Sequence, residues 1–437
     1  MKITIQEYGR IDKRQIGERA VHRLRKLDAL YERRDGMAVF DWRYDRYIRA
    51  RSVVGVIELP GLTIEVLPKT DKGPSSSNSA EWQNLARQNL LYMLAFTRDL
   101  PVKDRDVAHL ATQRMTILEI LAYTFAKRLV EIQRTGLAGG YVRREENCFF
   151  VKGKILTARN LLHNPAREDR IFVSFSEFSP DNKLNQLLKY ACRILLRATY
   201  TSATLQMLRE AVQRFADISD VRFTKDNSPE ISLDRTQAQY QVLINFARMI
   251  IHGLSSSPSA DRNETFSILF PMEQLFEEFI ARFILKNSHQ IGLSHAAIFV
   301  QSRGHQRSLV TKNGKAQFRL KPDLFIDAHA GPDRQIPRTI LDTKWKILDG
   351  SAPKQGVSQA DMYQLYAYSQ RFDCPVNILL YPAANGVKSE SYAVESRFGV
   401  SPKRINVETI NLNRSLIHST EQVIQDLRKI LLTAQAE

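Results

Sequence analysis

Two acidic residues and a lysine in the C-terminal part of the chain have the types and spacing of a metal-dependent hydrolytic site. Pro322-Asp323 lies in one apolar run, and Asp342-Thr343-Lys344 lies in the next. Carboxylate oxygens are the ligands that Mg²⁺ prefers, and phosphodiester hydrolysis needs both the metal and a group near the attacking water. We therefore expect Asp323 and Asp342 to hold Mg²⁺. Lys344 acts either as a positioning charge or, with a depressed pKa, as a general base.

The segments around these residues have the composition of β-strands. Apolar residues flank Pro322-Asp323, and a β-prone run extends over 339–347. Side chains alternate along a strand, so Asp342 and Lys344 are expected on one face. An isolated Asp-x-Lys triplet is more often part of a solvated strand face. Its combination with Pro-Asp on a neighbouring strand, joined through a polar loop at 331–338, favours a site.

A third element follows these strands. Gln364 and Tyr368 are four residues apart, one helical turn, and so face the same way on a helix. Helix packing explains such a pair, and so does contact with a DNA backbone or with Lys344. We favour the second interpretation.

The chain resembles the PD-(D/E)xK nuclease superfamily and its RecB-like branch, which carries a Gln-x-x-x-Tyr helix. The resemblance rests on three motifs in this order: Pro322-Asp323, Asp342-x-Lys344 and Gln364-x-x-x-Tyr368. Longer segments resemble McrC, the nuclease subunits of McrBC modification-dependent restriction systems. The resemblance covers 85–437 well and 1–75 weakly. The segments that carry it are 89–94, 182–189, 272–280, 341–346, 358–368 and 379–382.

The resemblance implies roles for individual residues. Asp323 and Asp342 would be metal ligands, Lys344 the catalytic lysine, and Glu277 a third acidic ligand. Glu277 lies in a segment whose apolar residues recur at helical spacing. The adjacent Glu278 competes for the same role, and a solvated or ion-paired glutamate fits this helix equally well.

Composition sets the broad class of the chain. Its 437 residues, 43% hydrophobic and 25% charged, indicate a soluble globular protein with two or three cores. The longest apolar helix, expected at 114–135, carries charged residues and does not fit a membrane span. The N-terminal residues lack a secretory h-region. Cys148, Cys192 and Cys374 form no CxxC pair, which favours a reducing cytoplasm.

The net charge of +16 indicates a polyanionic partner, and DNA is the expected one. Basic residues concentrate between Arg10 and Arg51, interleaved with Tyr31, Trp42, Tyr44 and Tyr47. Phosphate contact with base stacking fits this mixture. A solvated surface over ordinary core aromatics fits it almost as well.

Two segments rich in Ser, Gly and Pro, 70–80 and 253–260, have the composition of linkers. The chain is thereby divided into a small strand-rich N-terminal module at 1–75, a helical and β middle region at 80–253, and a PD-(D/E)xK endonuclease domain at 261–437. The last part has a helix, strands, a helix and further strands. This order predicts an α/β core with a mixed sheet flanked by helices, in a chain that is α+β overall.

Other catalytic motifs are missing from the sequence. There is no Walker A motif, because Gly153-Lys154 lacks the following Ser/Thr. The nine histidines form no HxH or HExxH cluster, and no GxSxG element occurs. Any nucleotide hydrolysis must therefore belong to a partner.

The resemblance supplies that partner, because McrC subunits join McrB, a hexameric AAA+ GTPase. It implies a Mg²⁺-dependent DNA endonuclease subunit of a GTP-driven, modified-cytosine-dependent (type IV) restriction complex. Strands at 141–177, whose loops are rich in basic residues, are the candidate partner contact, with solvated loops as the competing interpretation. Two alternatives stay open: a free-standing RecB-like repair or processing nuclease, and a non-catalytic adaptor that regulates an AAA+ motor.

Overall fold

The computed structural model divides the chain into two compact units, one of residues 1–117 with 269–437 and the other of residues 118–268. Both predicted linkers lie outside the described residues, apart from Ala80 and Gly253, and the three-part division stays a prediction. No described helix is long and apolar enough to cross a membrane. The structure describes residues 1–69, 80–100, 115–224, 227–253, 265–300, 307–327, 329–330, 335–384, 386–395 and 402–436.

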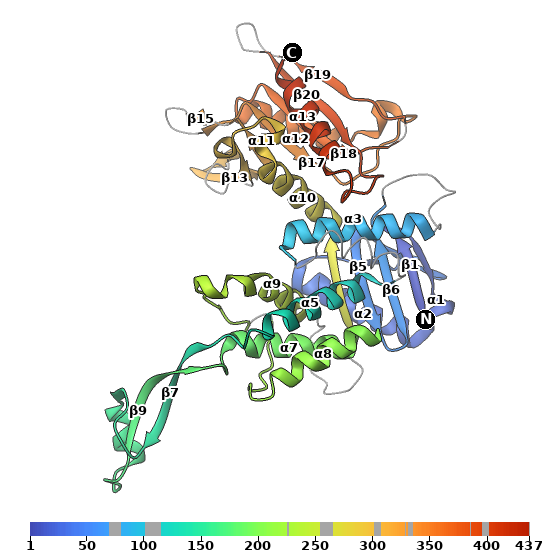
Figure 1. The fold of residues 1–437 in the computed structure, drawn as a ribbon. Coiled ribbons are helices and arrows are strands. Elements are labelled where there is room, and N and C mark those ends of the chain that lie inside the picture. The colour runs from blue at the N-terminus through green and yellow to red at the C-terminus, as the bar shows by residue number, and fades with distance from the viewer. Residues whose placement is uncertain are drawn as a thin grey trace. The chain divides into compact units, whose positions relative to one another are not determined.

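The N-terminal residues, together with residues 266–271, form two small sheets (Figure 1). In the first, with strand order β1-β6-β5-β10, β1 runs parallel to β6, and β5 and β6 form an antiparallel hairpin. The second has the order β2-β4-β3. The elements are β1 (Lys2–Gln6), β2 (Arg10–Asp12), α1 (Lys13–Ile16), α2 (Glu18–Asp35), β3 (Phe40–Asp41), β4 (Tyr47–Ala50), β5 (Val53–Leu59), β6 (Leu62–Leu67) and β10 (Phe266–Pro271).

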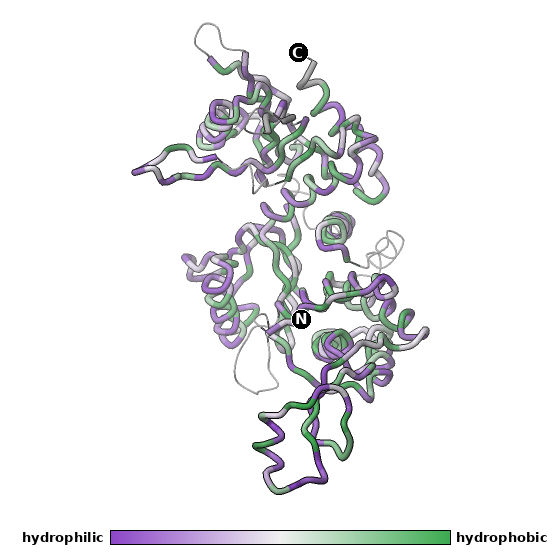
Figure 2. Tube along the Cα trace, turned by 90° about the vertical axis from the view of Figure 1, so that its left-hand side faces the viewer, coloured by the Kyte–Doolittle hydropathy of each residue, from purple (hydrophilic) through white to green (hydrophobic). Residues whose placement is uncertain are grey.

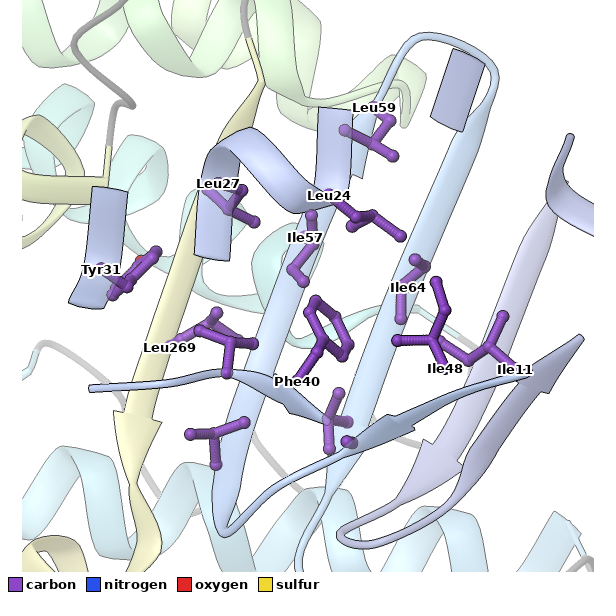
Figure 3. Close-up of a cluster of buried hydrophobic side chains, with 14 of the residues drawn as sticks. Ile11, Leu24, Leu27, Tyr31, Phe40, Ile48, Ile57, Leu59, Ile64 and Leu269 are labelled. Carbon is purple, nitrogen blue, oxygen red and sulfur yellow. The ribbon is translucent and has the colours of Figure 1, made fainter. Parts of the chain in front are cut away.

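Helix α2 packs its apolar face between these sheets (Figure 3). Leu24, Leu27 and Tyr31 of α2 lie in one buried cluster with Phe40 and Ile64. The helix is fixed further by the buried Asp28, whose carboxylate accepts hydrogen bonds from the Val39 amide at 2.6 Å and the Trp42 indole at 2.5 Å. Tyr31 and Trp42, two of the aromatic residues in the basic segment between Arg10 and Arg51, therefore pack into the core.

The second unit consists of helices and a long antiparallel finger, defined here as residues 140–179 (Figure 1). Strands β7 and β9 pair along their whole lengths, from Gly140↔Ser179 to Cys148↔Ile171. Strand β7 ends at Cys148, and the chain then turns, with Gly153 at φ +78°. The elements are α5 (Ile117–Gln133), β7 (Gly140–Cys148), β8 (Lys154–Ile155), α6 (Thr157–His163), β9 (Ile171–Ser179), α7 (Lys183–Ala198), α8 (Ser202–Arg214) and α9 (Gln241–Gly253).

The C-terminal residues form a mixed six-stranded sheet of order β11-β14-β17-β18-β20-β19. Strands β17, β18 and β20 are parallel, and the three others pair antiparallel, which confirms the predicted fold class. The strands are β11 (Phe299–Val300), β14 (Leu324–Ile326), β17 (Thr339–Thr343), β18 (Val376–Pro382), β19 (Glu390–Val394) and β20 (Lys403–Ile410).

Helices α10 (Met272–Lys286), α12 (Gln359–Arg371) and α13 (Thr420–Ala436) contact this sheet, and α3 (Ala80–Arg98) packs against α10 and strand β6. Leu365 and Tyr368 of α12 pack into a core with sheet residues such as Ile340 and Leu379. Asn89 of α3 is buried and donates from Nδ2 to the carbonyl of Leu412 at 3.0 Å. Polar and apolar contacts thus attach these helices to the C-terminal part of the chain.

Strand β17, which contains Asp342, is shorter than the run predicted at 339–347. β17 ends at Thr343, and the amide of Lys346 donates to the carbonyl of Lys344 at 3.0 Å, which closes a three-residue turn. Lys344 still continues the sheet by one hydrogen bond, from its amide to the carbonyl of Leu380 at 2.9 Å. The next residue, Trp345, is buried.

Candidate active site

Asp323 stands at the start of β14, opposite the end of β17. The antiparallel register pairs Leu324 with Leu341, so that one step further Asp323 faces Asp342. Its Oδ2 accepts hydrogen bonds from the amide of Thr343 at 2.7 Å and from the Thr343 hydroxyl at 2.8 Å. Thr343, the middle residue of the Asp-x-Lys triplet, therefore orients the first carboxylate.

Asp342 is 1% exposed and forms an ion pair with Lys344, whose Nζ lies 2.5 Å from Oδ2. The expected pairing of these two side chains on one face is therefore present, although Lys344 lies just beyond the strand. Lys346, which the alternation would put on the same face, donates instead from Nζ to the carbonyl of Gly356 at 2.6 Å.

Burial and charge act together on the protonation of these groups. Burial raises the pKa of Asp323 well above its usual range, and the carboxylates of Asp342 and Glu277 raise it further. Burial also raises the pKa of Asp342, although the Lys344 ammonium opposes this effect. Burial lowers the pKa of Lys344, but the Asp342 carboxylate more than offsets that, and the net shift is upward. A protonated Lys344 favours the positioning role over the general base.

The structure separates the two neighbouring glutamates of α10. Glu277 is close enough to Asp323 and Asp342 to raise the pKa of both carboxyl groups. The side chain of Glu278 is engaged with other residues, since its carboxylate forms an ion pair with Arg98 at 2.5 Å and accepts a hydrogen bond from Gln274 at 3.0 Å. Adjacent helical residues point about 100° apart, so only one of the two faces the aspartates.

Gln364 and Tyr368 of α12 bond to each other, with Gln364 Nε2 donating to the Tyr368 hydroxyl at 2.6 Å. Tyr368 is 1% exposed, and its ring packs edge-on against Phe372. Burial raises the pKa of the Tyr368 phenol, and the nearby Asp342 carboxylate adds to the shift. The pair thus lies beside the aspartates, with the tyrosine inside the core and Gln364 partly exposed.

Sequence reasoning missed Asp361 and Tyr381. The Asp361 carboxylate accepts a hydrogen bond from the Tyr381 hydroxyl at 2.9 Å, and its charge raises the pKa of both Asp342 and Lys344. The spacing could have predicted the position of Asp361, because it precedes Gln364 by three residues and Tyr368 by seven and so lies on the same face of α12.

The chemistry of the donor set fits Mg²⁺. Among the described residues, no group of three carboxylate, imidazole or thiolate side chains forms a ready metal site. Mg²⁺ in phosphoryl-transfer sites is commonly held by only one or two protein carboxylates, together with water and substrate phosphates. The carboxyl group of Asp342 is buried and that of Asp323 is partly buried, and their charges repel each other. A divalent cation between them would relieve that repulsion.

Comparison with known proteins identifies the family. Residues 48–382 match the family model described as McrBC 5-methylcytosine restriction system component. The chain belongs to this family. The match confirms the resemblance to McrC that the sequence segments indicated, and it extends from the N-terminal module to strand β18.

Two further proteins are similar to this chain. The type IV methyl-directed restriction enzyme EcoKMcrBC of Escherichia coli (strain K12) is 19% identical over 340 residues, 75% of this chain and 92% of the relative. A chain in the refined half-complex from a tetradecameric assembly of Thermococcus gammatolerans McrB AAA+ hexamers with bound McrC has the same fold. The TM-score between the two chains is 0.69 and their sequence identity is 19%. The superposition covers 99% of this chain and 100% of the Thermococcus gammatolerans chain.

Proposed function

We propose that this chain is the Mg²⁺-dependent DNA endonuclease subunit of a GTP-driven, modified-cytosine-dependent (type IV) restriction complex, acting in the cytoplasm. The observation that carries the proposal is the meeting of Asp323, Asp342 and Lys344 at facing ends of two paired strands. Membership of the McrBC family supports the restriction context. The net charge of +16 supports DNA as the substrate.

Each residue of the site has a role in this proposal. Asp323 and Asp342 hold Mg²⁺, with Glu277 as a third acidic ligand, and the bound metal supplies Lewis-acid stabilisation of the scissile phosphate. Thr343 keeps Asp323 turned toward Asp342 through two hydrogen bonds. Lys344 contributes an ammonium group that attracts the phosphate and orients the attacking water. Tyr368 of α12 supports this arrangement from inside the core, and the partly exposed Gln364, bonded to Tyr368, contacts the DNA backbone.

The partner in the proposal is a hexameric AAA+ GTPase of the McrB type. The solved relative with the same fold is assembled with McrB AAA+ hexamers, and this chain contains no Walker A motif of its own. We assign the contact to the finger, where hydrophobic and hydrophilic stretches alternate along the chain (Figure 2) and several large apolar side chains are exposed to solvent. Exposed apolar patches of this kind mark interaction surfaces. The residues are Tyr141, Phe149, Phe150, Leu161, Leu162 and Phe178.

Cleavage of methylated plasmid tests the catalytic part. With Mg²⁺, GTP and the AAA+ partner, the chain should cut, and Asp342→Asn should assemble and stimulate GTP hydrolysis without cutting. Cutting by the chain alone, without GTP, would favour a free-standing nuclease. GTP hydrolysis that rises while the wild-type complex never cuts would indicate an adaptor.

A separate experiment tests the finger. Replacing Phe149 and Phe150 by serine removes exposed apolar area without touching a core, so the chain should fold normally. We expect weaker association with the GTPase and loss of stimulated GTP hydrolysis. Tyr200→Ser, an exposed aromatic of the same unit outside the finger, is the matched control. Full stimulation by the finger variant would refute this assignment.

A further inference from the structure

A second feature of the C-terminal part is a ribbon of two strands, β12 (Arg307–Lys312) and β13 (Lys315–Leu320), referred to here as the basic ribbon. The strands pair antiparallel from Arg307↔Leu320 to Lys312↔Lys315. Asn313 and Gly314 close it with positive φ of 50° and 74°, the combination of a two-residue type I′ turn. The two strands form a sheet of their own, separate from the six-stranded sheet (Figure 1).

The basic ribbon is exposed on both faces. Every residue from 309 to 319 is solvent-exposed, including the apolar Leu309, Val310 and Phe318. Phe318 is 74% exposed and has a φ of +53°, a strained value for an aromatic residue. A two-stranded ribbon gains little stability alone. Its apolar side chains therefore have the character of a contact surface rather than of a core.

The base of the basic ribbon is attached to the helix of the candidate site. Arg371, at the end of α12, donates from Nε to the carbonyl of Ser308 at 3.1 Å. The Arg307 guanidinium donates to the carbonyl of Arg371 and lies 5.1 Å above the Phe372 ring. These contacts hold the ribbon in a defined position relative to Gln364 and Tyr368 on the same helix.

The charge of the ribbon has one sign. Residues 307–321 contain five basic side chains and no acidic one. The basic residues are Arg307, Lys312, Lys315, Arg319 and Lys321. Charge complementarity therefore selects a polyanion over an ordinary protein surface. A two-stranded β-ribbon also has the width that the major groove of B-DNA admits.

The ribbon leads directly into the catalytic residues. Lys321 follows β13, and Pro322-Asp323 comes next in the chain. Six residues of strand extend roughly 20 Å, about six base-pair steps of duplex. DNA that lies along the ribbon is thereby brought to Asp323 at its base.

We propose that the basic ribbon enters a groove of duplex DNA and holds the duplex against the catalytic carboxylates. Lys312, Lys315 and Arg319 contact phosphates, and Phe318 packs against sugars or base edges. The inference rests on the proposed nuclease function and adds to it the surface that grips the substrate.

Equilibrium binding tests the ribbon without any need for catalysis. The full chain is titrated with a fluorescent 30-base-pair duplex in EDTA, at several salt concentrations. Lys312→Ala with Lys315→Ala should weaken binding and reduce the slope of log K against log[salt] by about 2, since each phosphate contact contributes about 0.9. Lys388→Ala with Lys429→Ala, two exposed lysines elsewhere, removes the same charge and should leave the slope nearly unchanged.

The outcomes separate this inference from the proposed function. Unchanged binding by the ribbon variant, in a complex that still cuts, would overturn the ribbon and leave the nuclease in place. If the ribbon variant binds DNA more weakly and the wild-type complex never cuts, the DNA-binding role of the ribbon is supported and the proposed nuclease function is refuted. Normal DNA binding with loss of assembly with the GTPase would make the ribbon a protein-docking surface and refute the inference. Phe318→Ser, which alters no charge, should also weaken binding while keeping the wild-type salt slope.

Discussion

The indole Nε1 of Trp345 donates to both carboxylate oxygens of Glu7, at 3.0 and 3.1 Å. Trp345 directly follows Lys344, and Glu7 directly follows strand β1 at the other end of the chain. Glu7 also accepts from the amide of Lys69 at 3.0 Å and from the Ser52 hydroxyl at 3.3 Å. Phe276 of α10 packs edge-on against the Trp345 ring. The N-terminal residues are therefore bonded to the turn that contains Lys344 and Trp345.

Glu7 should make the stability of the chain depend on pH. Burial raises the pKa of its carboxyl group from 4.5 to about 8, although the hydrogen bonds from Lys69, Trp345 and Ser52 oppose the shift. Between these two values the folded chain binds more protons than the unfolded chain, so stability falls as pH rises, by about 1.4 kcal/mol per pH unit.

Glu7→Gln should remove this loss. We expect the variant to have a flatter dependence of unfolding free energy between pH 5 and pH 8, measured by denaturant titration. Glu18→Gln, at an exposed position of α2, is the control and should keep the wild-type slope. A Glu7→Gln variant with the wild-type slope would show that Glu7 is ionised throughout this range.

Trp345→Phe should destabilise the chain by about 1–3 kcal/mol, because Glu7 loses a donor while buried. The ring contact with Phe276 is kept, so the change isolates the hydrogen bond. Trp345→Ala should cost more, about 3–5 kcal/mol, since it also leaves a cavity. Wild-type stability of Trp345→Phe in denaturant unfolding would mean that the indole N–H contributes nothing.

Lys344→Ala should abolish cutting while the affinity for Mg²⁺ is kept, because Asp323 and Asp342 remain. Asp323→Ala should instead weaken Mg²⁺ binding itself, and calorimetric titration distinguishes the two. Lys346→Ala is the matched control, since this exposed lysine bonds to Gly356 and should be dispensable for cutting. A Lys344→Ala complex that cuts normally would remove this lysine from the mechanism.

Asp361→Asn should lower cutting by about 10- to 100-fold, the usual effect of losing a supporting carboxylate beside a metal site. Asparagine can still accept the hydrogen bond of Tyr381, so the fold should be unaffected and the loss should come from charge. Tyr381→Phe tests the complementary case, because it keeps the charge of Asp361 and removes the hydrogen bond that the Tyr381 hydroxyl donates to it. Wild-type cutting by Asp361→Asn would limit Asp361 to a packing role.

Local sequence patterns predicted several features of the site. Asp342 and Lys344 are two residues apart, and Gln364 and Tyr368 are four apart, so backbone periodicity alone directs each pair to one side. The Asn-Gly pair between β12 and β13 was an equally local signal for a hairpin, and sequence reasoning passed over it. The McrBC assignment also followed from segments read in order, and the family match confirmed it.

By itself, then, the sequence determined the strand and helix pairs, the mixed-sheet class and the family. Only the tertiary structure decided that Glu277 rather than Glu278 faces the aspartates, that Asp361 joins them, and that Glu7 holds Trp345. These relationships join residues from 19 to 338 positions apart. Backbone periodicity carries no information over such separations, because they are set by how helices and sheets pack.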